Sequence, residues 1–193
     1  MVLNNKIEAI RSSPLEFLLA GTSIQLWFLV SLAMALTLLY LFIKMGIENK
    51  FLYLAIPLYI IQILAGPLSI TPLGIHTGIG YYLGPFVSTL FVGIGALIAK
   101  KELKPSRQLA CWLIFAGLAM QLGESLLLHT IYGWDHFRQT GYIAGTVIYA
   151  TGFLFLALAI PSMGNKTGFS RLGKFTLGIY LTHMMFIPVA QEF

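Results

Sequence analysis

Glu124 is the residue whose type and position most directly suggest chemistry. It is a carboxylate near the end of a long apolar run, where a charge is costly unless it faces a cavity, takes up a proton or finds a polar partner. Gln121, three residues earlier, is expected on the same helix face, and His129 follows five residues later at the interface. A substrate or proton role and an interhelical polar clamp are both consistent with this pattern.

The histidines do not form a metal-binding pattern. His129 and His136 are seven residues apart with only Asp135 nearby, which matches neither a zinc spacing nor a helical pair four residues apart. We therefore expect no metal. His76 lies in a segment rich in proline and glycine, and His183 lies about nine residues into the last apolar run. No G-x-S-x-G turn or phosphate-binding loop accompanies them.

The composition requires that lipid surrounds the elements that carry these residues. Hydrophobic residues make up 58% of the chain and charged residues 10%, against about 25% charged residues in soluble domains. Apolar runs of about 20 residues match the length of a membrane-spanning helix, and no strand-like alternation is present. We predict an all-α polytopic transmembrane helical bundle of about six spans, over Ile24–Ile43, Phe51–Ile70, Tyr82–Ala99, Leu109–Leu128, Tyr142–Ile160 and Phe175–Val189.

Two further segments have distinct patterns. Residues 1–23 mix charged and apolar positions without the compact apolar core of a signal peptide, and we expect an extracytoplasmic amphipathic lead-in to a bundle formed by residues 24–193. The segment around Pro67 and Pro72 fits either a partly re-entrant loop or a plain irregular loop. Gly141 and Gly145, four apart, favour close helix packing.

The basic residues predict the orientation. Three alternate loops, at 44–50, 100–107 and 166–174, hold nine lysines and arginines, whereas the other loops and both ends hold three. Because basic residues concentrate on the cytoplasmic side, we expect both termini of this chain to be extracytoplasmic. The formal net charge of +5 therefore indicates contact with lipid head groups and not with nucleic acid.

Two stretches carry a specific pattern. They are Gln25-Leu-Trp27-Phe-Leu, at the start of the first span, and Leu172-Gly-Lys-Phe-Thr-Leu-Gly-Ile-Tyr180-Leu-Thr-His183, which leads into the last. Both resemble motifs of the acyltransferase-3 family. The family's corresponding patterns are H-L-W-F-L and one close to L-G-x-x-S-L-G-I-Y-L-L-H. The resemblance implies about ten spanning helices in the family, of which the first three and the last would be absent from this chain.

The resemblance implies an activity. Members transfer an acyl group, commonly acetyl, from acyl-CoA to a hydroxyl of a cell-surface or lipid-linked carbohydrate, so the expected role is polysaccharide O-acetylation in the cell envelope. The expected location is the bacterial inner membrane, and the donor substrate is acetyl-CoA or another acyl-CoA. The family's proposed catalytic histidine belongs to an absent helix, so a partial acyltransferase is expected.

The resemblance also extends to single residues. Trp27, Tyr180 and His183 match the family patterns, whereas Gln25 stands where the family has histidine. Gln25 can still form hydrogen bonds but cannot inherit a proton-transfer role. Candidate catalytic residues are His183 and Glu124. The candidate substrate-binding residues are Gln25, Trp27, Tyr180, His76 and His129.

The basic loops, with Lys100, Lys101 and Lys104 among their residues, are expected to attract the phosphates of coenzyme A. The sequence is also consistent with two functions other than acyl transfer. One is a small membrane transporter or channel subunit, which Gln121 and Glu124 suggest, and the other is an inactive scaffold module. The acceptor sugar, the acyl chain and the oligomeric state are not determined by the sequence.

Overall fold

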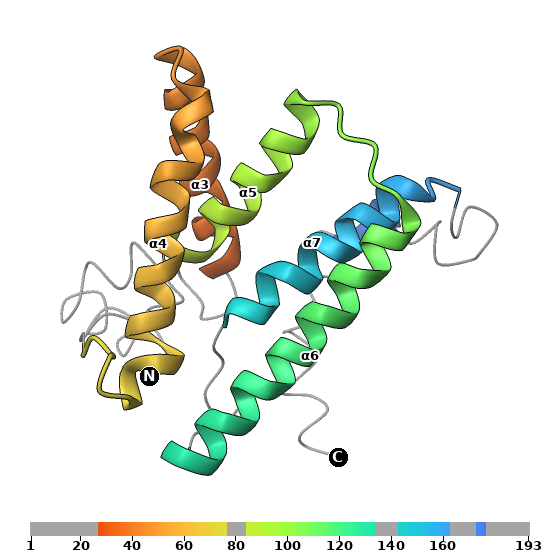
Figure 1. Cartoon of the computed structure of the whole chain (residues 1–193). Coiled ribbons are helices and arrows are strands. Elements are labelled where there is room, and N and C mark those ends of the chain that lie inside the picture. The colour runs from red at the N-terminus through yellow and green to blue at the C-terminus, as the bar shows by residue number, and fades with distance from the viewer. Residues whose placement is uncertain (1–26, 77–83, 134–142, 163–172, 177–193) are drawn as a thin grey trace, which may run out of the picture. The chain divides into compact units, whose positions relative to one another are not determined.

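A computed structural model describes residues 27–76, 84–133, 143–162 and 173–176 of the chain. Every element in these ranges is helical (Figure 1). The α-helices are α3 (Trp27–Lys44), α4 (Phe51–Ala65), α5 (Pro85–Lys100), α6 (Arg107–Tyr132) and α7 (Ala144–Ala159). Short 3₁₀ helices are η2 (Glu48–Lys50), η3 (Pro67–Ile70) and η4 (Gly173–Phe175). The predicted helical bundle is thus confirmed over the described residues.

Helix α4 ends earlier than the predicted span. Pro67 disfavours helical geometry at the residue before it, and Gly66, with φ −104° and ψ −107°, ends the helix after Ala65. The chain continues as η3 and then turns back, so that the Ile75 N–H donates to the Leu64 carbonyl over 2.9 Å. The segment described here is therefore an irregular turn packed on the end of α4.

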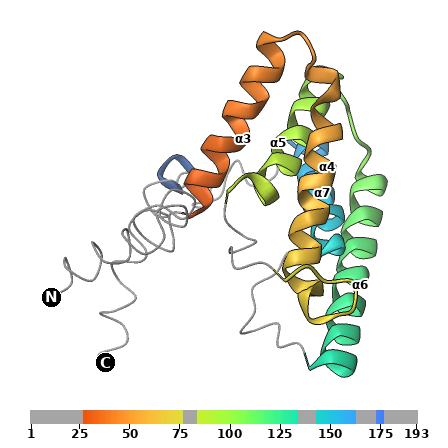
Figure 2. The ribbon, with the colours of Figure 1, turned by 90° about the vertical axis from the view of Figure 1, so that its left-hand side faces the viewer.

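Helices α3, α4 and α5 pack together, with α5 in contact with both of the others. The core between α4 and α5 contains Ala55 and Tyr59 from α4 and Val87 and Leu90 from α5. Between α3 and α5, the buried hydroxyls of Ser31 and Ser88 are 2.6 Å apart and form a hydrogen bond. Figure 2 shows the three helices from a second direction.

Helix α6 is the longest element, and its two ends are capped. At its start the Ser106 hydroxyl accepts a hydrogen bond from the Leu109 N–H, and at its end Gly133 adopts φ +68°, a conformation that glycine reaches without strain. Its 26 residues extend over about 39 Å. Among the described residues α6 alone is both long and apolar enough to cross a membrane; α3, α5 and α7 are shorter apolar helices.

Helices α6 and α7 lie side by side (Figure 1), because glycines remove the side chains between them. A Cβ on Gly145 would lie 2.5 Å from the Gln121 nitrogen, and one on Gly152 would lie 2.8 Å from the Ile114 nitrogen. A Cβ on Gly117 would meet the backbone of Tyr149. The expected close packing at Gly145 is present, while Gly141 lies outside the described residues.

The outward faces of the helices are apolar. Tyr53, Trp112, Phe115 and Leu122 are each at least 70% exposed, which a surface facing water rarely tolerates over so many large residues. Such a surface suits lipid as the solvent. The chain divides into residues 1–159 and 160–193 as separate units, and all the helices named above except η4 belong to the first.

Candidate functional site

A small group of polar side chains meets at the first turn of α7. The Glu124 Oε2 accepts a hydrogen bond from the Gly145 N–H over 3.0 Å, and the Thr146 hydroxyl donates to the Gln121 Oε1 over 2.8 Å. Gln121 and Glu124 therefore share a face of α6, as their spacing predicts. We call these four residues, together with Tyr59 and Ile143, the α7 polar cluster.

The position of Glu124 has an electrostatic reason. The first N–H groups of a helix have no partner within the helix and carry a partial positive charge. The half-buried Glu124 carboxylate supplies an acceptor at this point of α7. Of the two hypotheses for Glu124, the polar clamp between helices is thus observed directly, and it gives the carboxylate a structural partner.

Tyr59 connects helix α4 to the same group. Its hydroxyl is buried and donates to the Ile143 carbonyl over 2.9 Å, while the Ile143 N–H donates to the Thr146 hydroxyl over 3.3 Å. Hydrogen bonds thus link Tyr59, Ile143, Thr146 and Gln121 in sequence. Side chains from α4 and α6 together fix the start of α7.

Gln62, one turn beyond Tyr59 on α4, is the least satisfied polar residue of this region. Its side chain is fully buried, and neither its amide nitrogen nor its amide oxygen has a hydrogen-bond partner among the described residues. A buried polar group left unpaired costs about 1–3 kcal/mol. Because such groups are rare in folded proteins, Gln62 requires an explanation.

The predicted site residues are only partly within the described ranges. Glu124 belongs to the α7 polar cluster, His129 is exposed in the last turn of α6, and His76 is exposed at the end of a described segment. Trp27 begins α3, but its side chain is outside the described part. Gln25, Tyr180 and His183 lie outside the described residues altogether. The structure does not bring His76 or His129 into the cluster.

The lysines considered for phosphate binding lie at the other end of these helices. Lys100 ends α5, and Lys101 and Lys104 are exposed in the segment that follows. Lys100 Nζ donates to Glu48 Oε1 and to Asn49 Oδ1, both over 2.7 Å. The loop after α3 and the loop after α5 therefore meet at one end, as the alternation of loops along the chain predicts.

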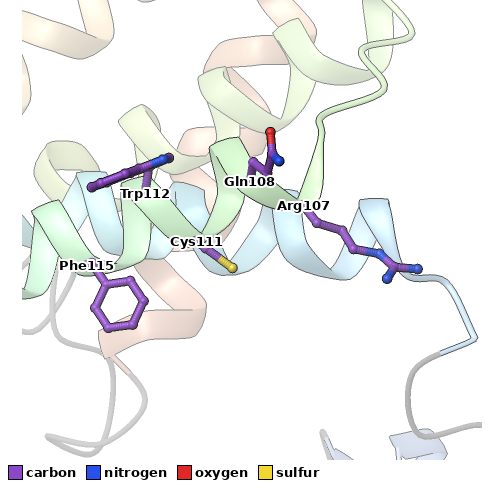
Figure 3. Close-up of a pocket in the computed structure, with 5 residues that line it drawn as sticks. All are labelled: Arg107, Gln108, Cys111, Trp112 and Phe115. Atoms are coloured by element: carbon purple, nitrogen blue, oxygen red, sulfur yellow. The ribbon is translucent and has the colours of Figure 1, made fainter.

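Two other observations concern metal binding and the surface of α6. No group of three His, Cys, Asp or Glu side chains that could hold a metal ion occurs in the part of the chain that the structure describes. A hollow on α6 is lined by residues of that helix alone, from its first three turns (Figure 3). Trp112 and Phe115, which line it, are exposed apolar side chains, so this surface suits contact with lipid.

Tyr59, Gln62 and Thr146 were not identified from the sequence. Gln62 carries a visible signal, because it is the one amide within the apolar run of α4 and buried amides need partners. Tyr59 and Thr146 carry no comparable signal, since both residue types are common in membrane helices. The role of Tyr59 arises from packing between segments 84 residues apart in the chain, and that of Thr146 from a contact with Gln121, 25 residues away on α6.

Comparison with known proteins identifies the class. The family model described as an acyltransferase domain matches residues 4–193, almost the whole chain. This chain belongs to the acyltransferase-3 family and is a membrane acyltransferase at the level of the family. No curated protein and no solved structure matches it.

Proposed function

We propose that this protein transfers an acyl group, with acetyl the favoured one, from acyl-CoA to a hydroxyl of a cell-surface or lipid-linked carbohydrate. Membership of the acyltransferase-3 family supports the group-transfer step. The acetyl-CoA donor, the carbohydrate acceptor and the bacterial inner membrane are parts of the proposal that follow from the family resemblance. The proposed reaction forms an ester at the sugar hydroxyl and releases the coenzyme A thiol.

The observation that carries the proposal at the level of residues is the buried carboxamide of Gln62, which forms no hydrogen bond within the described part of the chain. A sugar hydroxyl both donates and accepts hydrogen bonds, and so does a carboxamide. Because the Gln62 side chain is fully buried, this proposal requires the helices around it to separate before an acceptor can pair its two amide atoms, which have no partner among the described residues. Gln62 is therefore assigned to binding of the acceptor and not to proton transfer.

The roles of the other candidates differ. Acyl transfer needs a base for the hydroxyl proton and donors for the negative charge that develops on the carbonyl oxygen. In this proposal His183 takes the proton in place of the family's proposed catalytic histidine, because a histidine side chain can gain and lose a proton near neutral pH. Glu124 is a positioning residue, because its Oε2 is engaged by the Gly145 N–H. Gln25, Trp27, Tyr180, His76 and His129 remain candidate contacts to the substrates.

The direct test measures transfer of labelled acetyl from acetyl-CoA to carbohydrate in membranes that contain the protein. We expect His183→Gln to lower the rate by about 10²- to 10⁴-fold, the usual contribution of a positioned acid or base. Cys111→Ser is the matched control, since Cys111 is exposed on α6, and it should leave the rate unchanged. Full activity of His183→Gln would contradict the assignment of the base, and no transfer by the unaltered protein would contradict the proposed reaction.

A transporter or channel function is not favoured. That alternative rested on Gln121 and Glu124 as polar groups available to a transported solute. In the structure the Gln121 Oε1 and the Glu124 Oε2 accept hydrogen bonds from the first turn of α7, which is sufficient to explain why these polar residues lie in an apolar helix.

A further inference from the structure

A hollow of about 340 Å³ opens between α3, η2, α4 and α5, at the end where Lys100 lies. It is separate from the α7 polar cluster, with which it shares no residue. Four of its lining residues are polar and lie at the helix ends: Glu48, Asn49, Lys100 and Lys101. We call these four residues the mouth. The rest of the lining is apolar and includes Leu39, Ile43, Phe51, Leu52, Gly93, Ala96 and Leu97.

The hollow has depth along the helices. On α5 its lining extends from Lys101 back to Gly93, which is about 12 Å along a helix axis. On α3 it includes Leu39 and Ile43, the latter one residue before the end of that helix. A polar mouth at the helix ends, with Leu39 and Gly93 one to two turns farther along α3 and α5, matches the division of a bilayer into head-group and hydrocarbon layers.

The mouth carries an excess of positive charge. Two lysines face one glutamate there, which leaves one net positive charge. Lys100 is paired with Glu48 by a hydrogen-bonded ion pair of 2.7 Å. No carboxylate forms an ion pair with Lys101 within the ranges that the structure describes. The mouth thus suits a single anionic group beside Lys101, and Glu48 is the native group that competes for Lys100.

We propose that this hollow binds an anionic phospholipid, with the phosphate at Lys101 and Lys100 and one acyl chain along Leu39, Leu52 and Leu97. Charge favours this occupant, because a basic site between helices at the membrane surface attracts anionic head groups. The apolar wall favours a lipid over a free phosphate, which would leave the deeper part of the hollow unfilled. From the sequence, Lys100 and Lys101 are expected to attract the phosphates of coenzyme A, and this proposal assigns the two lysines to a lipid phosphate instead.

The proposal makes opposite predictions for two neighbouring residues. Lys101→Gln removes a cation and should weaken binding of phosphatidylglycerol about fivefold, the factor that corresponds to about 1 kcal/mol per lysine at an anionic surface. Glu48→Gln removes the competing carboxylate and should strengthen binding by a similar factor. If Glu48 only stabilised the fold, Glu48→Gln would not bind phosphatidylglycerol more strongly.

The experiment uses the purified protein in vesicles of phosphatidylcholine with increasing phosphatidylglycerol, and native mass spectrometry measures the lipid that stays bound. Lys104→Gln is the matched control, because Lys104 lies in the same segment but does not line the hollow, and its binding should equal that of the unaltered protein. Thermal stability in phosphatidylcholine alone shows whether each variant is folded.

Three results would overturn the proposal. The first is equal retention of the two lipids by the unaltered protein. The second is weaker phosphatidylglycerol binding by a folded Glu48→Gln variant. The third is displacement of the lipid by millimolar inorganic phosphate or by coenzyme A, either of which would assign the mouth to a soluble phosphate. Insensitivity to both, together with the opposite effects of Lys101→Gln and Glu48→Gln, is the expected result.

Discussion

Two polar groups of this molecule differ in how much water reaches them. The Lys100–Glu48 pair lies at the helix ends, where the two side chains are 47% and 32% exposed. The α7 polar cluster is made mostly of neutral hydrogen bonds between buried or half-buried groups. Exposed ion pairs contribute little to stability, whereas a buried group that loses its partner has no water to replace it. We therefore attribute stability to the cluster, whereas the exposed pair should contribute little to it.

The largest loss of stability is expected from changes at the glycines that let α6 and α7 approach closely. Gly117→Val places a side chain on the backbone of Tyr149 and should lower the free energy of unfolding by about 1–3 kcal/mol or more. Gly123→Val on the same helix meets nothing within 4 Å and serves as the control. Thermal unfolding in detergent measures both. Equal stability of the two variants would mean that close packing of α6 on α7 does not hold the cluster.

The next effect tests the link from α4. Tyr59→Phe leaves the Ile143 carbonyl without the tyrosine hydroxyl and should cost about 1–3 kcal/mol. Tyr53→Phe is the matched control, because Tyr53 lies on the same helix and is 80% exposed, against 4% for Tyr59. Thermal unfolding in detergent measures both variants. If Tyr53→Phe lost as much stability as Tyr59→Phe, the buried hydroxyl of Tyr59 would have no particular role in stability.

The smallest effect belongs to the ion pair and depends on pH. The hydrogen bond and the charge of Lys100 lower the pKa of Glu48 below its ordinary value of 4.5. A carboxyl whose pKa is lower in the folded state binds protons more readily when unfolded, so it stabilises the fold above pH 4.5. This contribution is lost as the pH falls through the lowered pKa.

Unfolding of the unaltered protein and of Glu48→Gln should therefore differ slightly at pH 7 and converge in acid. High salt should reduce the difference at pH 7, since the pair is exposed. A difference that persisted at low pH would show that Glu48 acts through packing and not through its charge.

The sequence predicted part of the arrangement of each polar group. Spacing along α6 predicted that Gln121 and Glu124 share a face, and alternation of the loops predicted that the loops near Glu48 and Lys100 lie at one end. Neither pattern could identify the first turn of α7 as the partner of Glu124, because that contact depends on how two helices cross. The end of α4 at Ala65 was predictable in principle from Gly66 and Pro67, but hydropathy alone extended the span to Ile70.

The proposed role of Gln62 links stability to function. Measuring the free energy of unfolding and the rate of acyl transfer in Gln62→Leu tests whether this buried amide binds the acceptor. Removing a buried amide that has no partner among the described residues should raise the free energy of unfolding, by up to about 1–3 kcal/mol. Under the proposed function, the same change should lower the rate of acetyl transfer to carbohydrate, because the proposed acceptor loses its hydrogen bonds. Higher stability with slower transfer is the predicted result. Unchanged transfer in a stable Gln62→Leu variant would contradict the account.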